Sequence, residues 1–135
     1  MCLIKEWDTG NKVEFAWKIF SVKGDGKLYP MKTKYDLGKS FDTNSWISCK
    51  DSKGFHCFIT RENAEITLNT VIEFQKLFPD KFPSNQFVVR KVEIKEITVW
   101  GFSIRNRSDF VDVIKHEIAP KEPNSLRTKE IKIIE

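Results

Sequence analysis

Apolar and polar residues alternate along the first long segment of the chain. In KVEFAWKIF (residues 12–20), every second residue from Val13 to Ile19 is apolar, and Glu14 and Lys18 lie between them. A period of two is typical of a β-strand that buries one face. The pattern therefore predicts a half-buried strand whose covered face carries Val13 to Ile19.

A predicted turn and further predicted strands follow this first strand. Gly24-Asp25-Gly26 supplies the positive-φ positions of a tight hairpin. Pro30 lacks a backbone N–H, so it restricts the next strand to an edge or to a short piece. Strands are also predicted over residues 85–104 and 127–135. Within the first of these, the apolar positions change phase after Lys95-Glu96, which predicts a bulge or turn.

One segment has a convincing helical period. It covers about residues 61–78, with Thr60 as the candidate N-cap and Pro79 as the stop. Ile66 and Leu77 project from the side opposite the main apolar stripe. The stripe itself recurs at 3.6-residue spacing and comprises Ala64, Leu68, Val71, Phe74 and Phe78.

Two further segments are short and apolar. GFHCFIT (residues 54–60) has the apolar density of a strand covered on both faces. Residues 109–119 admit a helix, because Phe110, Val113 and Ile118 can share a face. Alternation of Val111 and Val113 admits a strand instead, and we favour the strand.

The order of elements is strands, one helix, then strands. It predicts an α+β fold in which a curved, mainly antiparallel sheet packs on one central helix. A length of 135 residues is typical of a single domain, here residues 1–135. Eleven Phe and four Trp supply enough large rings for a substantial core.

Charge and cysteine content narrow the class of protein. A net charge of +4 arises from 23 cations and 19 anions, which mildly favours acidic or phosphate-bearing partners. A dedicated nucleic-acid binder concentrates basic charge far more strongly. Three cysteines, an odd and low number, fit a reducing cytosol. We expect neither a signal peptide nor a membrane span, because no apolar run approaches about 18 residues.

His56 and Cys57 are adjacent, and neighbouring residues of a strand point to opposite faces. His56 therefore cannot easily activate Cys57, and the two are poorly placed to join Cys49 in a metal site. We expect no catalytic residue, no metal and no cofactor. Cys57 is expected to pack with Phe55 and Ile59, while His56 shares the other face with Phe58 and is a candidate ligand-binding group.

The densest basic region is interleaved with aromatic residues. Such an arrangement can hold single-stranded nucleic acid or a nucleotide, although cations on a strand more often form a solvated face. Trp100 and Phe102 lie between these basic residues, and aromatic residues left exposed would suggest a partner surface because they concentrate at interface hot spots. The candidate binding residues of this region are Arg90, Lys91, Trp100, Arg105 and Arg107.

Four short motifs follow one another along most of the chain: KLYPMKTKY with a following LGK, then KGFHCF with ENA, then VEIKEITVWG, and finally TKEIKII. In this order they resemble the motifs of a loose family of small phage and prophage proteins. The resemblance implies a phage or mobile-element context and adds Tyr29 and Tyr35 to the candidate binding residues. The matching residues are Tyr29, Pro30, Tyr35, Gly38, Gly54, Phe55, His56 and Ala64.

A second, local resemblance concerns the strand–helix junction. GFHCFIT followed by ENA is similar to the junction of ADP-ribosyltransferase-like folds, with His56 where a tyrosine would stand. It implies a nucleotide-binding or transferase-like protein that uses a pocket near Gly54–His56. No E-x-E motif follows downstream.

Together these observations predict a small non-enzymatic accessory protein of a phage or mobile element. We expect it to act in the cytoplasm of the host cell by binding and inhibiting a host macromolecule, as an anti-defence inhibitor does. The expected partner is a host protein or a protein–nucleic-acid complex. The alternative is the nucleotide-binding or ADP-ribosyltransferase-like protein just described.

Overall fold

A computed structural model describes residues 3–10, 12–31, 40–50, 53–80 and 86–134. Over these described residues the chain is α+β, as expected, with a seven-stranded sheet, one long helix and one short helix. The strands are β1 (Lys5–Trp7), β2 (Phe15–Val22), β3 (Leu28–Pro30), β4 (Trp46–Ser48), β5 (Phe55–Phe58), β6 (Gln86–Phe102) and β7 (Ser125–Ile133). The helices are α1 (Arg61–Leu77), α2 (Arg107–Phe110) and a π-helical turn, η1 (Val111–Lys115).

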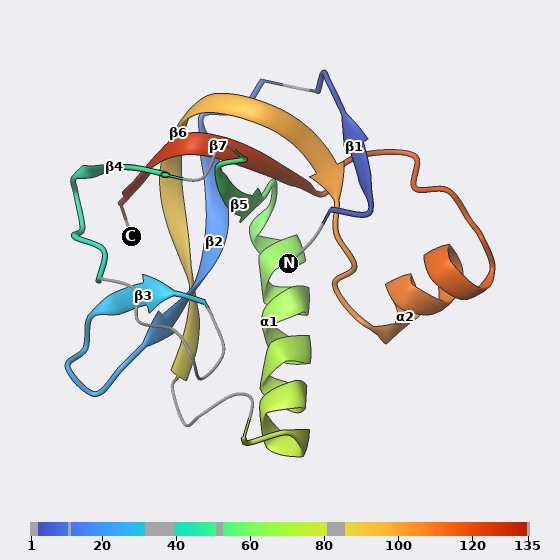
Figure 1. Cartoon of the computed structure of the whole chain (residues 1–135), viewed down its shortest axis with the longest axis horizontal. Coiled ribbons are helices and arrows are strands. Elements are labelled where there is room, and N and C mark those ends of the chain that lie inside the picture. Colours follow the sequence, from blue (N-terminus) through green and yellow to red (C-terminus); the bar gives the residue numbers. More distant parts are fainter. Residues whose placement is uncertain (1–2, 11, 32–39, 51–52, 81–85, 135) are drawn as a thin grey trace.

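Four strands of the sheet pair in a closed ring. β2 pairs with β6, β6 with β7, β7 with β5, and β5 with β2, and all of these pairings are antiparallel. Outside the ring, β1 pairs with β6, β3 pairs with β2 and β4 pairs with β7. The long β6 arches over the molecule so that its first half lies along β2 and its second half along β7 (Figure 1). The expected curved antiparallel sheet is confirmed.

The arch of β6 contains the bulge that the phase change predicted. Between Ile97 and Val99 the register advances by two residues on β6 but by only one on β7, which leaves Thr98 as the extra residue. Glu96, just before it, has a φ of 56°. An extra residue increases the local bend and twist of a strand. The bulge therefore lets one strand serve two partners.

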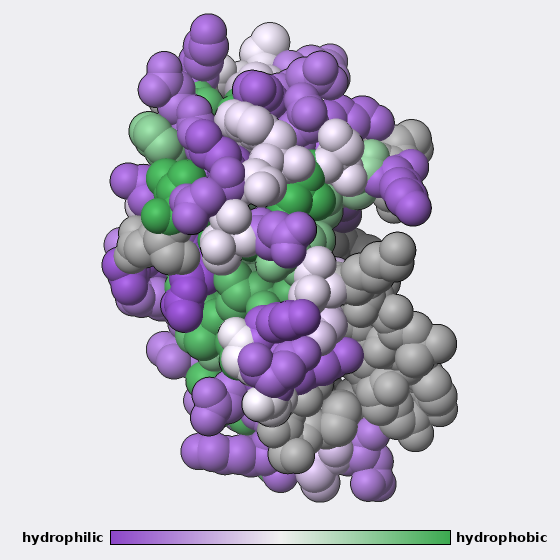
Figure 2. Space-filling view, turned by 90° about the vertical axis from the view of Figure 1, so that its left-hand side faces the viewer, coloured by the Kyte–Doolittle hydropathy of each residue, from purple (hydrophilic) through white to green (hydrophobic). Residues whose placement is uncertain are grey.

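The described residues form one hydrophobic core inside this ring and a second core outside it, against α1. The first fills the ring and takes side chains from all four of its strands, with Phe20, Leu126 and Ile131 fully buried. The second lies between α1 and strands β2, β5 and β6, around Phe58 and Ala64. Figure 2 shows the side that carries β3 and β4. Hydrophobic residues lie mainly in the middle of this face, and hydrophilic residues lie toward its top and bottom.

The strand β2 is covered on both faces, so the prediction of a half-buried strand was wrong. Ala16 and Phe20 point into the ring and are fully buried, whereas Ile19 points toward α1. Phe15, on the face expected to be covered, is 37% exposed. Closure of the ring covers the face of β2 that was expected to be solvated. The residues on this inward face therefore include the small side chain of Ala16 and the long, amphipathic side chain of Lys18.

The helix α1 begins as predicted and ends one residue early. Thr60 is the N-cap, and its hydroxyl accepts a hydrogen bond from the backbone N–H of Asn63 at 3.2 Å. Ala64 and Val71 of the predicted stripe are buried, but Phe74 near the end of α1 remains 46% exposed. The stripe is therefore confirmed in the first turns and wrong in the last ones.

Residues 107–115 are helical, which corrects our preference for a strand over residues 109–119. Asn106 caps α2 by accepting the backbone N–H of Asp109 at 2.9 Å. Arg105 pairs with Asp109 over one turn, with 2.7 Å between Nε and Oδ2. A capping amide and an ion pair four residues apart both favour a helical turn over an extended chain.

The strand β5 is covered on both faces, as predicted, and it begins at a constrained glycine. Cys57 packs in the ring and Phe58 against α1. Gly54 has a φ of +89°, and a Cβ at this position would lie 2.5 Å from the carbonyl oxygen of Thr128. The glycine thus permits close packing of β5 against the β7 backbone.

We expect Gly54→Ala to lower the free energy of unfolding by about 2 kcal/mol, because the φ is unfavourable and the backbone must shift. Urea unfolding measures the change. Gly24→Ala is the matched control, since nothing lies within 4 Å of a Cβ there. Equal stability of the two variants would contradict a packing role for Gly54.

Candidate functional site

His56 lies on β5 with its ring edge-to-face against Phe58, at 4.9 Å between centroids. Its backbone carbonyl accepts a hydrogen bond from Nζ of Lys18 at 2.9 Å. Nε2 of His56 is buried and has no hydrogen-bond partner. Burial, with repulsion from Lys18 and Arg127, places the pKa of His56 well below its ordinary value. The imidazole is therefore neutral near pH 7.

Cys57 lies on the opposite side of β5, inside the ring with Phe55 and Ile59, as predicted. Burial raises the pKa of its thiol to about 11, against a weaker opposing effect of Lys18. A thiol in this state is a poor nucleophile. The described residues contain no cluster of three or more His, Cys, Asp or Glu side chains arranged to hold a metal ion.

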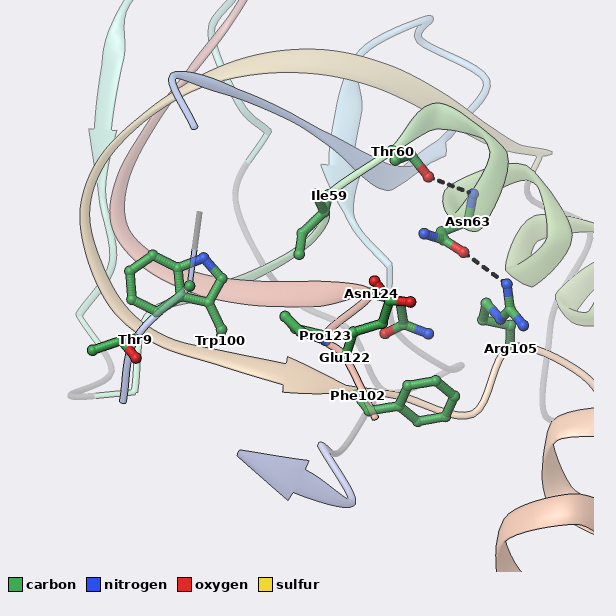
Figure 3. A pocket seen from close by; sticks show the side chains of 11 residues that line it. Thr9, Ile59, Thr60, Asn63, Trp100, Phe102, Arg105, Glu122, Pro123 and Asn124 are labelled. Atoms are coloured by element: carbon green, nitrogen blue, oxygen red, sulfur yellow. Dashed lines mark hydrogen bonds between the residues drawn. The ribbon is translucent and has the colours of Figure 1, made fainter. Parts of the chain in front are cut away.

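A cavity of about 790 Å³ opens where the end of β6 meets the start of α1. Figure 3 draws the indole of Trp100 at one end, the guanidinium of Arg105 at the other, and Glu122 and Pro123 between them. Volumes of 300–1,000 Å³ are typical of small-molecule sites. The lining residues are Thr9, Gly10, Ile59, Thr60, Asn63, Trp100, Phe102, Arg105, Glu122, Pro123 and Asn124.

Arg105 forms the wall at the α1 end of this cavity. Its Nε and Nη2 donate to the two carboxylate oxygens of Asp109, at 2.7 and 2.8 Å, and its Nη1 donates to Oδ1 of Asn63 at 2.7 Å. Burial alone would raise the pKa of Asp109, but the hydrogen bonds from Arg105 outweigh it and lower the pKa. Both groups are therefore charged at neutral pH and compensate each other.

The far side of Arg105 borders a second hollow, an apolar groove of about 860 Å³ between α1 and residues 104–110. Its apolar lining includes Phe74, Leu77 and Phe110. Figure 1 shows α2 standing away from the sheet, beyond α1. We call this hollow the α1–α2 groove.

The structure divides the candidate binding residues among separate places. Trp100 and Arg105 meet at the cavity, and Arg105 and Arg107 meet at the α1–α2 groove. Arg90 lies opposite Lys18 in the sheet, and the ammonium of Lys91 lies 4.7 Å from the ring of Phe15.

Tyr29 belongs to the β2–β3 hairpin, where its hydroxyl donates to Asp25 at 2.5 Å. The ammonium of Lys23 lies 4.2 Å from its ring centroid. Tyr35 lies outside the described residues. The basic and aromatic candidates therefore do not form one continuous surface.

Sequence reasoning missed several residues of the cavity. Glu122 and Pro123 come from a loop that showed no pattern beyond its turn residues, and Thr9 from a similar loop near β1. Gly10 covers Trp100 so closely that a Cβ there would lie 2.6 Å from Cδ1 of the indole. The sequence did contain an indication of the groove, because Leu77 is an apolar residue on the side of the helix opposite its main apolar stripe.

The chain matches no protein-family model, and comparison with curated proteins and with solved structures also finds no match. No helix among the described residues is long and apolar enough to cross a membrane. The geometry of the site is therefore the basis for any statement about function.

We expect stability to depend on the protonation of His56. Because the folded protein holds a depressed pKa, the unfolded chain takes up a proton near pH 6.5 that the folded protein does not, so the free energy of unfolding falls as pH drops below about 6.5. The slope is at most about 1.4 kcal/mol per pH unit.

Urea unfolding at closely spaced pH values between about 7.5 and 5 measures this slope, above the main range of carboxylate titration. His56→Phe should flatten it. His116→Phe, which changes the exposed second histidine, should retain the wild-type slope. A slope unchanged in His56→Phe would show that His56 is not the titrating group.

Proposed function

We propose that this protein is a non-enzymatic binding protein that docks on a partner protein through the α1–α2 groove. The observation that carries the proposal is the concentration of exposed apolar side chains in the groove, which Phe74, Leu77 and Phe110 line, and on the chain segments that adjoin it in sequence. Among the described residues, nine large apolar side chains are exposed, and six of them lie at the end of α1 or on residues 110–118. These six are Phe74, Leu77, Phe78, Phe110, Ile114 and Ile118.

Exposure of this kind is costly unless a partner covers it. Leu77 is 70% exposed and lines the groove with Phe74 and Phe110, while Phe74 and Phe78 stack with 6.2 Å between centroids. Burial of apolar area contributes about 25 cal/mol per Å². Contiguous exposed apolar surface is therefore typical of an interaction site.

Charge indicates the kind of partner. Arg107 and Glu73 are both exposed and line the groove together with its apolar side chains. The whole chain carries a net charge of +4. A partner surface with an apolar ridge, an acidic residue placed against Arg107 and a basic residue placed against Glu73 complements these features, because unlike charges at an interface rim steer association.

The biological setting follows from the resemblance to phage and prophage proteins. We propose that the partner is a host protein, alone or in a protein–nucleic-acid complex, and that binding inhibits it in the host cytoplasm. The neutral, buried His56 and the protonated Cys57 support a role without catalysis.

Leu77→Asp tests the groove. Affinity capture from host lysate with wild-type protein should enrich a defined partner, and Leu77→Asp should reduce that enrichment about tenfold or more, because a charge replaces a central apolar contact. Ile4→Asp is the control, since Ile4 is an exposed apolar residue of β1's flank that does not line the groove. Equal capture by both variants would argue against the groove.

The nucleotide-binding alternative is supported by Lys18 and Arg127, the cations that surround His56. Gly54 contributes less than the resemblance implied, because it faces the Thr128 backbone. Labelled NAD separates the two proposals. Transfer of label or a thermal shift would favour the alternative, and neither is expected for a protein that docks through the groove.

A further inference from the structure

We propose that the cavity between Trp100 and Arg105 binds a small aromatic amine, a planar apolar body that carries an ammonium group. This site is separate in its lining from most of the α1–α2 groove, with which it shares only Arg105. The proposal therefore does not depend on the proposed function.

The charges at the cavity favour a cation. Arg105 is the basic residue of the lining, and Asp109 compensates it through both carboxylate oxygens. Glu122 also lines the cavity, and it makes no hydrogen bond or ion pair with another described residue. The charge that remains available to a ligand is thus the carboxylate of Glu122, which attracts an ammonium and repels a phosphate or a carboxylate.

The polar groups near Arg105 are already partly used within the protein. Oδ1 of Asn63 accepts from Arg105, and the backbone N–H of Asn63 donates to Thr60. The side-chain amide of Asn124 bonds to both the backbone N–H and the carbonyl of Ser103. Part of the hydrogen-bonding capacity at the start of α1 is therefore occupied within the protein, and the negative charge of Glu122 opposes the binding of an anion at the positive end of the helix dipole.

The apolar part of the lining favours a planar ligand body. Trp100 and Phe102 provide two aromatic rings, and Ile59 and Pro123 provide flat aliphatic surfaces. Figure 3 shows Ile59 and Pro123 between the indole and Arg105. Aromatic rings that pack together gain about 0.5–1.5 kcal/mol beyond the area that they bury.

One further detail supports the assignment of an aromatic amine. The ring of Phe102 lines the same cavity as Glu122, so an ammonium there gains both a carboxylate and a cation–π contact.

The test uses three matched probes. Phenethylamine has the proposed chemistry, 3-phenylpropionate has the same ring with the opposite charge, and n-butylamine has the ammonium without the ring. Titration of the full ¹⁵N-labelled chain follows the indole N–H of Trp100, identified by its loss in Trp100→Phe. Phenethylamine should shift this signal saturably, and each of the other probes should bind at least about tenfold more weakly.

Glu122→Gln supplies the test by mutation. Glu122 is exposed, so the variant should fold as the wild type does, and it should raise the Kd for phenethylamine about tenfold through loss of a charge-assisted hydrogen bond. Glu6→Gln, an exposed carboxylate of β1 outside the cavity lining, should leave the Kd unchanged. Gly10→Ala displaces the indole and should also weaken binding.

Three results would overturn the proposal. The first is the absence of a saturable shift of the Trp100 indole signal with phenethylamine up to about 10 mM, because a Kd above this concentration is too weak for a specific small-molecule site. The second is equal binding of 3-phenylpropionate or n-butylamine, which would remove the charge or the ring from the argument. The third is an unchanged Kd in Glu122→Gln while the amide spectrum shows an intact fold.

Discussion

The structure depends on one strand having to pair with two others that point in different directions. β6 runs along β2 and then along β7, and only a bent strand can do both. Thr98 provides the bend as an extra residue, and Glu96 precedes it with a positive φ. Without the bulge, the ring of β2, β6, β7 and β5 could not close, and the core inside it would lose a wall.

Closure of the ring determines what each strand must bury. A strand in an open sheet packs on one side, but β2 and β5 are enclosed by the ring on one face and by α1 on the other. Ala16 and Cys57 are small enough to fit the narrow interior, while Lys18 reaches to a carbonyl of β5 with its charged end. Burial at the ring disfavours the charged forms of ionisable groups, so it lowers the pKa of Lys18 and of His56 and raises the pKa of Cys57.

The same arrangement brings the end of β6 to the start of α1, where the cavity forms, and the residues that follow β6 then lie along the rest of α1, where the groove forms. Arg105 lies shortly after β6, and its bonds to Asp109 of α2, four residues away, and to Asn63 of α1, 42 residues away, connect the end of the strand to both helices. One side of this connection becomes a cavity with a free carboxylate, and the other becomes an apolar groove beside Arg107. Both hollows have volumes typical of binding sites.

Sequence alone predicted several features with local causes, although it missed the helical turn that Asn106 caps. The Gly24–Gly26 turn, the Thr60 cap and the bulge after Glu96 follow from the backbone preferences and side-chain hydrogen bonds of neighbouring residues, and all three are present. The separation of His56 from Cys57 followed from strand alternation for the same reason.

Tertiary structure decided whatever depended on which surfaces meet. Burial of the Ala16 face of β2 required the ring to close, and exposure of Phe74 at the end of α1 depended on where the covering surface stops. Glu122 became a candidate ligand group only because its loop lies beside Trp100 and α1. Such contacts join residues far apart in the chain, and a pattern of neighbouring residues does not contain them.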